Sequence, residues 1–164
     1  MQLRTHLYLL LICVLSLPAS ASNPHLAKVF EDAKSQGTLV LESLNSGKRY
    51  VHNPKRAHQP FTAASTFKVL HTLIALNEGV VKGIDSPIIW DGKQRGIPSW
   101  NRDQTLQSAF QVSCVWCYQQ FAQQIDQSTY TRHLQQADYG QLSTPFSTTE
   151  FWLNGALQIS ADIR

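Results

Sequence analysis

The apolar residues near the start of the chain form short β-rich runs, and further along they change to a helical spacing. Residues 38–41 and 49–51 are rich in β-branched and aromatic side chains, and the stretch 45–47 (Asn-Ser-Gly) separates them. This arrangement predicts a β-hairpin. In a later segment, apolar residues recur every three or four positions until Gly79. That spacing predicts a helix over residues 65–78, ended by the glycine.

The second half of the chain is predicted to be helical. Ser147 and Glu150 have the spacing of a capping box ahead of an aromatic pair, so a helical turn is expected there. Strands followed by helices predict an α+β fold rather than alternating βαβ units. The three other expected helices each begin at a residue that can cap the first turn: residues 103–111 from Asp103, 113–125 from Ser113 and 128–137 from Ser128.

The first 21 residues have the pattern of a secretory signal peptide. A basic start with Arg4 precedes a short apolar run, and a small-residue triplet ends at Ala21. The run is too short for an anchored membrane helix. We therefore expect an exported, periplasmic protein without a membrane anchor, whose single domain spans residues 22–164. A buried amphipathic first helix is the alternative interpretation.

Charge and cysteine spacing bound the possible partners. The net charge is +3 and no basic run reaches five residues, which argues against nucleic-acid binding.

Cys114 and Cys117 have a C-x-x-C spacing, but a helical pattern continues past them and no strand precedes them. We expect two small buried helix residues, with a redox pair as the alternative. No second ligand pair is spaced for a metal site. Nothing in the pattern sets an oligomeric state.

Ser65 is the candidate nucleophile because Lys68 follows it three residues later on the same helix face. A serine attacks only when a neighbouring base takes its proton. Lysine serves as that base when apolar neighbours such as Phe67 lower its pKa by desolvation. Backbone N–H groups of the helix's first turn would stabilise a developing oxyanion. Taken alone, the spacing also fits a capping serine followed by a surface lysine.

Several ordered segments add specificity to this pair. They are Ala64-Ser65-Thr66-Phe67-Lys68, Trp90-Asp91-Gly92-Lys93, Trp100-Asn101-Arg102-Asp103, Ser113-Cys114-Val115, Tyr139-Gly140-Gln141 and Phe151-Trp152-Leu153-Asn154-Gly155. Ser-x-x-Lys occurs in penicillin-binding proteins and class A β-lactamases. With these segments, the chain resembles the class D β-lactamases over essentially all of its predicted domain. The resemblance implies the penicillin-recognising serine β-lactamase fold, a helical region plus an antiparallel sheet.

The resemblance implies a chemical role for three residues. Ser65 would attack a β-lactam and become acylated. Lys68 would be carbamylated by carbon dioxide (N6-carboxylysine) and act as the general base, and Ser113 would relay a proton to the lactam nitrogen. No metal and no cofactor other than carbon dioxide is implied. For Ser113, a helix cap is the alternative.

The resemblance also implies residues that position the substrate or the carbamate. Val115 would pack against the carbamate, and Trp152 would donate its indole N–H to it. Tyr139 and Gly140 would lie beside the substrate. As a structural alternative, Trp152 anchors the core.

The sequence departs from the family pattern at three places. Gln141 stands where the family has asparagine, and Asn154 replaces an acidic residue. Glu150 with Asn154 imitates the spacing by which class A enzymes position water, although the capping box explains Glu150 as well. No Lys-[Ser/Thr]-Gly follows the tryptophan segment. We therefore expect missing C-terminal sheet strands, with apolar surface of the 38–52 hairpin facing water.

Four functions compete at this stage. A class D serine β-lactamase is the leading hypothesis. A penicillin sensor would acylate without turnover, and a cell-wall peptidase-like penicillin-binding protein would lack the tryptophan segment. An inactive truncated fragment would not unfold cooperatively.

Overall fold

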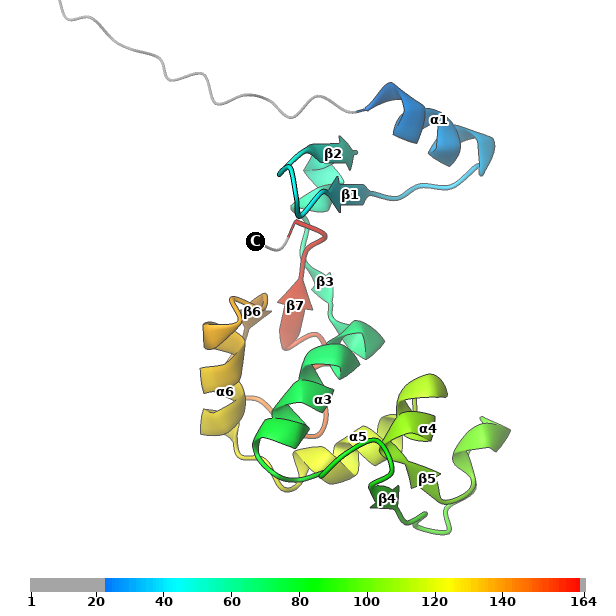
Figure 1. Ribbon diagram of the computed structural model, residues 1–164, viewed down its shortest axis with the longest axis vertical. Helices are drawn as coiled ribbons and strands as arrows, with labels where there is room; N and C mark the ends of the chain where they lie inside the picture. Colours follow the sequence, from blue (N-terminus) through cyan, green and yellow to red (C-terminus); the bar gives the residue numbers. More distant parts are fainter. Residues whose placement is uncertain (1–22, 163–164) are drawn as a thin grey trace, which may run out of the picture.

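The computed structural model describes residues 23–162, so the predicted signal peptide lies outside the described residues. The first helix, a hairpin and the short helix after it form one end of the molecule, and the helices that follow residue 64 form the other (Figure 1). Within the described part, no helix is long and apolar enough to cross a membrane. The predicted α+β class is confirmed. The elements are α1 (Pro24–Asp32), β1 (Leu39–Glu42), β2 (Arg49–His52), α2 (Pro54–Ala57), β3 (Phe61–Thr62), η1 (Ala64–Phe67), α3 (Lys68–Asn77), β4 (Pro87–Ile88), η2 (Pro98–Trp100), β5 (Gln104–Thr105), α4 (Leu106–Gln111), α5 (Val115–Ala122), α6 (Gln127–Gln136), β6 (Gln141–Leu142) and β7 (Leu157–Ile159).

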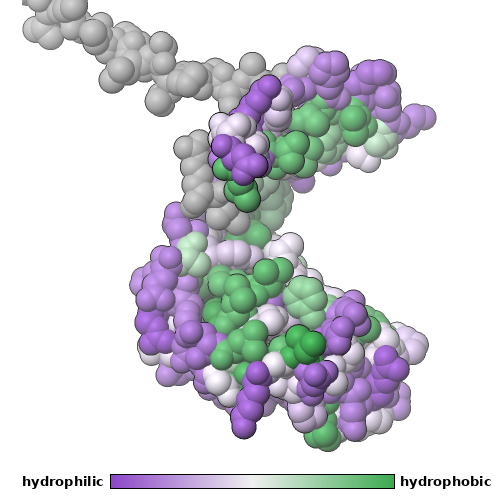
Figure 2. Space-filling view, viewed as in Figure 1, coloured by the Kyte–Doolittle hydropathy of each residue, from purple (hydrophilic) through white to green (hydrophobic). Residues whose placement is uncertain are grey.

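The predicted hairpin is confirmed as β1 and β2, which pair antiparallel with Leu39 opposite His52. This pair forms a sheet of its own among the described strands. Its apolar side chains face solvent as expected, since Leu41 is 55% and Leu44 100% exposed. Apolar side chains are visible at this end of the molecule in Figure 2. The hairpin therefore buries little of its own apolar surface.

A second sheet lies between the hairpin and the helices and has the strand order β3-β7-β6. The strand β7 is central: Phe61 in β3 pairs with Ile159, and Leu142 in β6 pairs with Leu157. Just before β6, Gly140 has a φ of 70°, and a Cβ there would overlap the backbone oxygen of Gln158. Glycine is therefore required by both the backbone angle and the close approach of β7.

The predicted helices are confirmed, but their first turns differ from the expectation. The helix expected over 65–78 begins as the 3₁₀ turn η1 and continues as α3. The N-caps are Thr105, Cys114 and Asp126, not the predicted Asp103, Ser113 and Ser128. Asp103 instead accepts a hydrogen bond from the Trp90 backbone, and Ser128 donates to Asp126. Several polar residues next to each boundary can cap, and packing decides which of them does.

After Ser147 the chain makes single helical turns, in which the Phe151 N–H donates to the Ser147 carbonyl, but no regular helix follows. The predicted capping box is not formed, because the Ser147 hydroxyl contacts the Thr149 hydroxyl instead. Residues 149–153 form turns. Phe151 and Trp152 are both fully buried although they are adjacent, and a regular surface helix would point neighbouring side chains about 100° apart. The chain instead folds back, so that the Trp152 carbonyl accepts the Ala64 N–H and the Phe151 carbonyl accepts the Leu157 N–H.

The core is an aromatic cluster enclosed by α3, α5, α6 and the turn at residues 149–153. Five rings in it are at most 3% exposed: Phe67, Tyr118, Phe121, Tyr130 and Phe151. Their ring centroids lie 4.9 to 6.4 Å apart in tilted and edge-on pairs, the geometry that aromatic quadrupoles favour. The buried face of α3, the helix that follows Ser65 and begins at Lys68, packs against this cluster.

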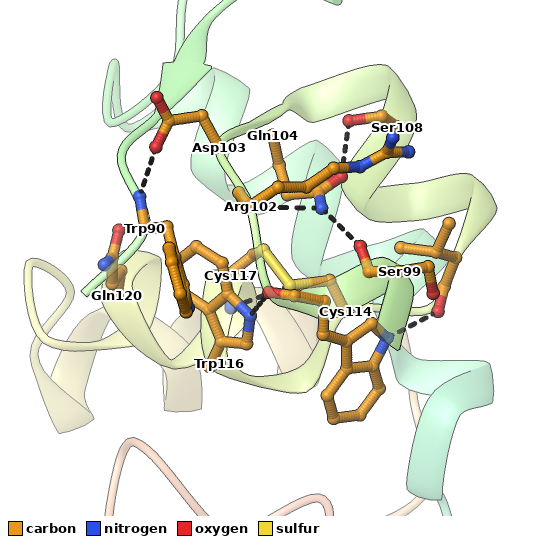
Figure 3. The surroundings of a disulfide bond; sticks show 12 residues. Trp90, Ser99, Arg102, Asp103, Gln104, Ser108, Cys114, Trp116, Cys117 and Gln120 are labelled. Carbon is orange, nitrogen blue, oxygen red and sulfur yellow. Dashed lines mark hydrogen bonds between the residues drawn. A yellow bond between two sulfur atoms is a disulfide. The ribbon is translucent and has the colours of Figure 1, made fainter. Parts of the chain in front are cut away.

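Cys114 and Cys117 form a disulfide, which corrects the expectation of two separate thiols (Figure 3). Both residues are fully buried, as expected. Cys114 caps α5 and accepts the Cys117 N–H through its sulfur, so the first turn of the helix brings the two sulfur atoms together. Between them, Trp116 donates its indole N–H to the Trp100 carbonyl at 2.9 Å. The disulfide therefore closes the first turn of α5.

Candidate active site

Ser65 and Lys68 meet where η1 changes into α3. In a 3₁₀ turn, side chains three residues apart are eclipsed, and the Lys68 Nζ lies 2.9 Å from the Ser65 Oγ. Ser65 is exposed, whereas Lys68 is only 3% exposed. The expected pairing on one helix face is thus present, with an accessible hydroxyl above a buried amine.

Ser113 approaches the same hydroxyl from the loop between α4 and α5. Its Oγ donates to the Ser65 Oγ at 3.1 Å across 48 residues of sequence. Ser113 has a φ of 52° and Ala64, beside the nucleophile, has a φ of 48°. Such angles are unfavourable for residues with a Cβ and are found at functional sites that the surrounding structure holds in place. Strained backbone is therefore found on both sides of this contact: Ser113 contributes one hydroxyl group, and Ala64 immediately precedes Ser65, which contributes the other.

Lys68 has no carboxylate partner among the described residues. Its hydrogen-bond partner is Ser65, and its ammonium nitrogen lies 5.5 Å from the centre of the Tyr118 ring. Burial lowers the pKa of Lys68 below the usual 10.5, because desolvation disfavours the charged form. The side chain is thereby shifted toward the neutral amine, which accepts a proton from a serine or reacts with carbon dioxide.

Trp152 is fully buried, and its indole Nε1 has no hydrogen-bond partner in the described structure. Its ring centroid lies 6.0 Å from that of Phe67, the residue that precedes Lys68. An unpaired buried N–H costs about 1 to 3 kcal/mol, so an acceptor is expected there. A carbamate on Lys68 would be such an acceptor, and the unpaired Trp152 N–H and the buried Lys68 amine are compatible with it. Trp152 also has the role of a core anchor.

The other predicted positioning residues lie around this centre. Val115 is half-buried at the first position of α5. Tyr139 packs against the core residue Phe67, and the centroids of the two rings are 5.9 Å apart. Gly140 packs against β7. The structure therefore joins Ser65, Lys68 and Ser113 directly, whereas Tyr139 and Gly140 support the sheet and the core behind them.

The residues that depart from the family pattern take structural positions. Glu150 is exposed at a turn and forms no hydrogen bond with Ser65 or Lys68 among the described residues. Gln141 pairs with Gln158 in the sheet. The Asn154 side chain accepts the Ala156 N–H at 3.0 Å. The alternative in which Glu150 is the base thus has no contact to support it.

One buried polar residue beside the site, His71, was not singled out from the sequence. It follows Lys68 by three residues on α3, is fully buried, and contacts Tyr130 through its Nε2 at 2.6 Å. The sequence could have indicated His71, because its position three residues after Lys68 lies on the face of α3 that is buried in the core. Within residues 23–162, no group of three His, Cys, Asp or Glu side chains is arranged to hold a metal ion.

Comparison with known proteins agrees with this arrangement. Residues 27–161 match the penicillin binding protein transpeptidase domain. Beta-lactamase OXA-48 of Klebsiella pneumoniae is 43% identical over 132 residues, and the match covers 80% of this chain and 50% of the relative. Beta-lactamase OXA-20 of Pseudomonas aeruginosa is 38% identical over 137 residues, covering 82% and 52%.

Solved structures show the same similarity. The class D β-lactamase FUS-1 (OXA-85) of Fusobacterium nucleatum has a TM-score of 0.81 at 33% identity, covering 85% of this chain and 58% of that one. A class D β-lactamase of Bacillus subtilis has a TM-score of 0.77 at 37% identity, covering 81% and 56%.

The fold and the Ser-x-x-Lys centre define a penicillin-recognising transpeptidase domain, and the chain belongs to the class D β-lactamase family within that group. It spans about half the length of the curated relatives it matches.

Proposed function

We propose that this protein is an exported, periplasmic serine β-lactamase that hydrolyses β-lactam antibiotics through an acyl-enzyme at Ser65. The single observation that carries the proposal is the position of the Ser65 hydroxyl, which contacts both the Lys68 amine at 2.9 Å and the Ser113 hydroxyl at 3.1 Å. The β-lactamases named among its relatives support the choice of substrate class. A nucleophile with one basic and one hydroxyl neighbour suits opening of a strained amide ring.

Acylation needs one proton to move from the serine to the leaving nitrogen. With carbon dioxide bound, Lys68 would take the proton of Ser65 through its carbamate as the Ser65 Oγ bonds to the lactam carbonyl carbon. The ring C–N bond breaks, and the Ser113 hydroxyl passes a proton to the nitrogen, regaining one from the Lys68 carbamate. The result is a seryl ester with an amine where the lactam nitrogen was, so atoms and protons balance.

Deacylation needs a base that removes a proton from water. Lys68 would hold the carbon dioxide as a carbamate, which would supply a carboxylate-like base at the buried amine, and Trp152 would hold that carbamate through its indole N–H. Its otherwise unpartnered Nε1 supports this assignment. Val115, at the adjacent start of α5, limits access of bulk water. Hydrolysis of the ester returns free Ser65 and releases the opened, carboxylic acid product.

Covalent labelling with a fluorescent penicillin, followed by denaturing electrophoresis, tests the nucleophile. Ser65→Ala should abolish the label, and Ser128→Ala, an exposed serine near the start of α6, should retain it. Hydrolysis of a chromogenic cephalosporin should then rise on addition of bicarbonate. A permanent label without turnover would instead assign the protein as a β-lactam sensor, and equal labelling of the Ser65→Ala variant would contradict the proposal.

A further inference from the structure

His71 is an ionisable residue within the aromatic cluster, and it follows Lys68 by three residues on α3. It is fully buried. The rings of Phe67, Tyr118 and Trp152 lie 5.1 to 5.2 Å from its own. Burial and the nearby Lys68 lower the pKa of His71 to about 3, so its imidazole is neutral at physiological pH and carries a single N–H.

The hydrogen bond to Tyr130 determines which nitrogen of His71 carries that proton. The Tyr130 hydroxyl lies 2.6 Å from His71 Nε2, and burial raises the pKa of Tyr130, so the phenol keeps its proton. If Nε2 were the donor, both the phenol proton and the Nδ1 lone pair would be left unpaired in the core. If the phenol donates to Nε2, only the Nδ1–H is left. The second arrangement leaves fewer unpaired groups, so Nδ1 carries the proton.

Two buried N–H donors in neighbouring rings therefore lack an acceptor in the described structure. They are His71 Nδ1 and Trp152 Nε1, in rings whose centroids are 5.1 Å apart at an angle of 67°. The cationic form of Lys68 acts electrostatically on His71, and Lys68 also lies over the Tyr118 ring that His71 contacts edge-on. A pair of unpaired donors beside a buried amine is arranged for an anion at that amine rather than for an ammonium.

We propose that His71 is a positioning residue that donates its Nδ1–H to the carbamate on Lys68, alongside the indole of Trp152. The inference rests on the proposed function, because it requires carbon dioxide to react with Lys68. In that reaction an N–C bond forms and one amine proton leaves to solvent, so a potential cation is replaced by an anion with two oxygen acceptors. Each donor then has its own oxygen, and Tyr130 sets the tautomer that makes this possible.

Carbon-13 NMR of the whole protein in labelled bicarbonate measures the carbamate directly, without any turnover. The resonance should vanish in Lys68→Ala, which assigns it. In His71→Leu, which keeps volume but loses both nitrogens, half-saturation should require about tenfold more bicarbonate, since one hydrogen bond to a charged group is lost. His71→Asn places an amide donor near the Nδ1 position and should restore affinity to within about twofold.

Two further comparisons separate positioning from packing. Tyr130→Phe removes the partner of Nε2 but keeps an imidazole, so it should weaken the carbamate less than His71→Leu. Thermal unfolding identifies any variant that does not fold, and His71→Asn carries the test if His71→Leu fails. Two results would overturn the role of His71 while leaving the carbamate in place. One is the same bicarbonate affinity in wild type and in folded His71→Leu, and the other is a His71→Asn protein that needs as much bicarbonate as His71→Leu. A wild-type protein without any resonance would overturn the carbamate in the proposed function as well.

Discussion

At the scale of single residues, the site depends on polar side chains held in an apolar environment. Lys68 and His71 are both buried on one face of α3, and neither has a carboxylate partner among the described residues. Desolvation lowers the pKa of each. Burial of Lys68 therefore costs stability, and it makes the amine beside Ser65 easier to deprotonate.

Lys68→Met is expected to abolish labelling by penicillin and to stabilise the fold by on the order of 1 kcal/mol, because methionine fills the site without a buried charge. Urea unfolding of both proteins measures the difference. The unfolded chain binds the lysine proton more tightly than the folded chain does, so wild-type stability should rise as the pH increases toward 10.5. The advantage of the variant should shrink over the same range. A less stable Lys68→Met protein would contradict this account.

Ser113→Ala should slow acylation of Ser65 about a hundredfold, the lower range for loss of a proton-transfer group. The single-turnover rate of labelling by a fluorescent penicillin measures the effect. Ser113 contacts the nucleophile at 3.1 Å, so the loss should appear in the rate of bond formation and little in the melting temperature. An unchanged rate would show that Ser113 has no part in proton transfer and serves only as part of the turn before α5.

At the scale of elements, the start of α5 determines how Ser113 reaches Ser65. Cys114 follows Ser113, caps the helix and is bonded to Cys117 in the first turn. Trp100 and Trp116 brace the same turn, because Trp100 donates to the Val112 carbonyl and Trp116 donates to the Trp100 carbonyl, each at 2.9 Å. The loop that carries Ser113 is thus attached at both ends, which suits a residue with an unfavourable φ.

Reduction of the Cys114–Cys117 disulfide should lower the free energy of unfolding by about 2 kcal/mol, the entropic value for so short a loop. Urea unfolding with and without a phosphine reductant measures it. Because both cysteines are buried, the native protein should resist alkylation. Labelling of Cys114 and Cys117 after unfolding without reductant would show that the bond does not form.

At the scale of the whole molecule, the core is concentrated at one end. The cluster of buried apolar residues starts at Ala63 and includes Leu157, whereas among residues 23–62 only Val51 and Ala57 are buried apolar residues. In Figure 1 the hairpin and α1 lie apart from the helices, joined to them through β3 and β7. Local stability follows buried apolar area, so the two ends should differ.

Native-state hydrogen exchange is expected to show this difference. Amides of β1 and β2 should exchange through local opening, with protection at least a hundredfold below that of α5, because their hydrogen bonds have little apolar cover. Amides of α5 should approach the global stability. The same protection in the hairpin and in α5 would show that the molecule unfolds as one cooperative unit.

Much of the site was predictable because its first contact is local. The spacing of Ser65 and Lys68 alone places the two side chains on one helix face, and the hairpin and the helices followed from periodicity. Helix ends were predicted less well. Asp103 and Ser128 are as capable of capping as Thr105 and Asp126 are, and the choice between such neighbours depends on packing.

Other features were decided only by the tertiary structure, because they join residues that are remote in sequence. The contact of Ser113 with Ser65 spans 48 residues, and the adjacency of His71 and Trp152 depends on the turn that buries two successive aromatic rings. Whether a polar atom in the core lacks a partner cannot be read from spacing, since every surrounding element contributes to the answer. The sequence by itself predicted the pairing of Ser65 with Lys68, and the tertiary structure determined the buried environment that lowers the pKa of Lys68.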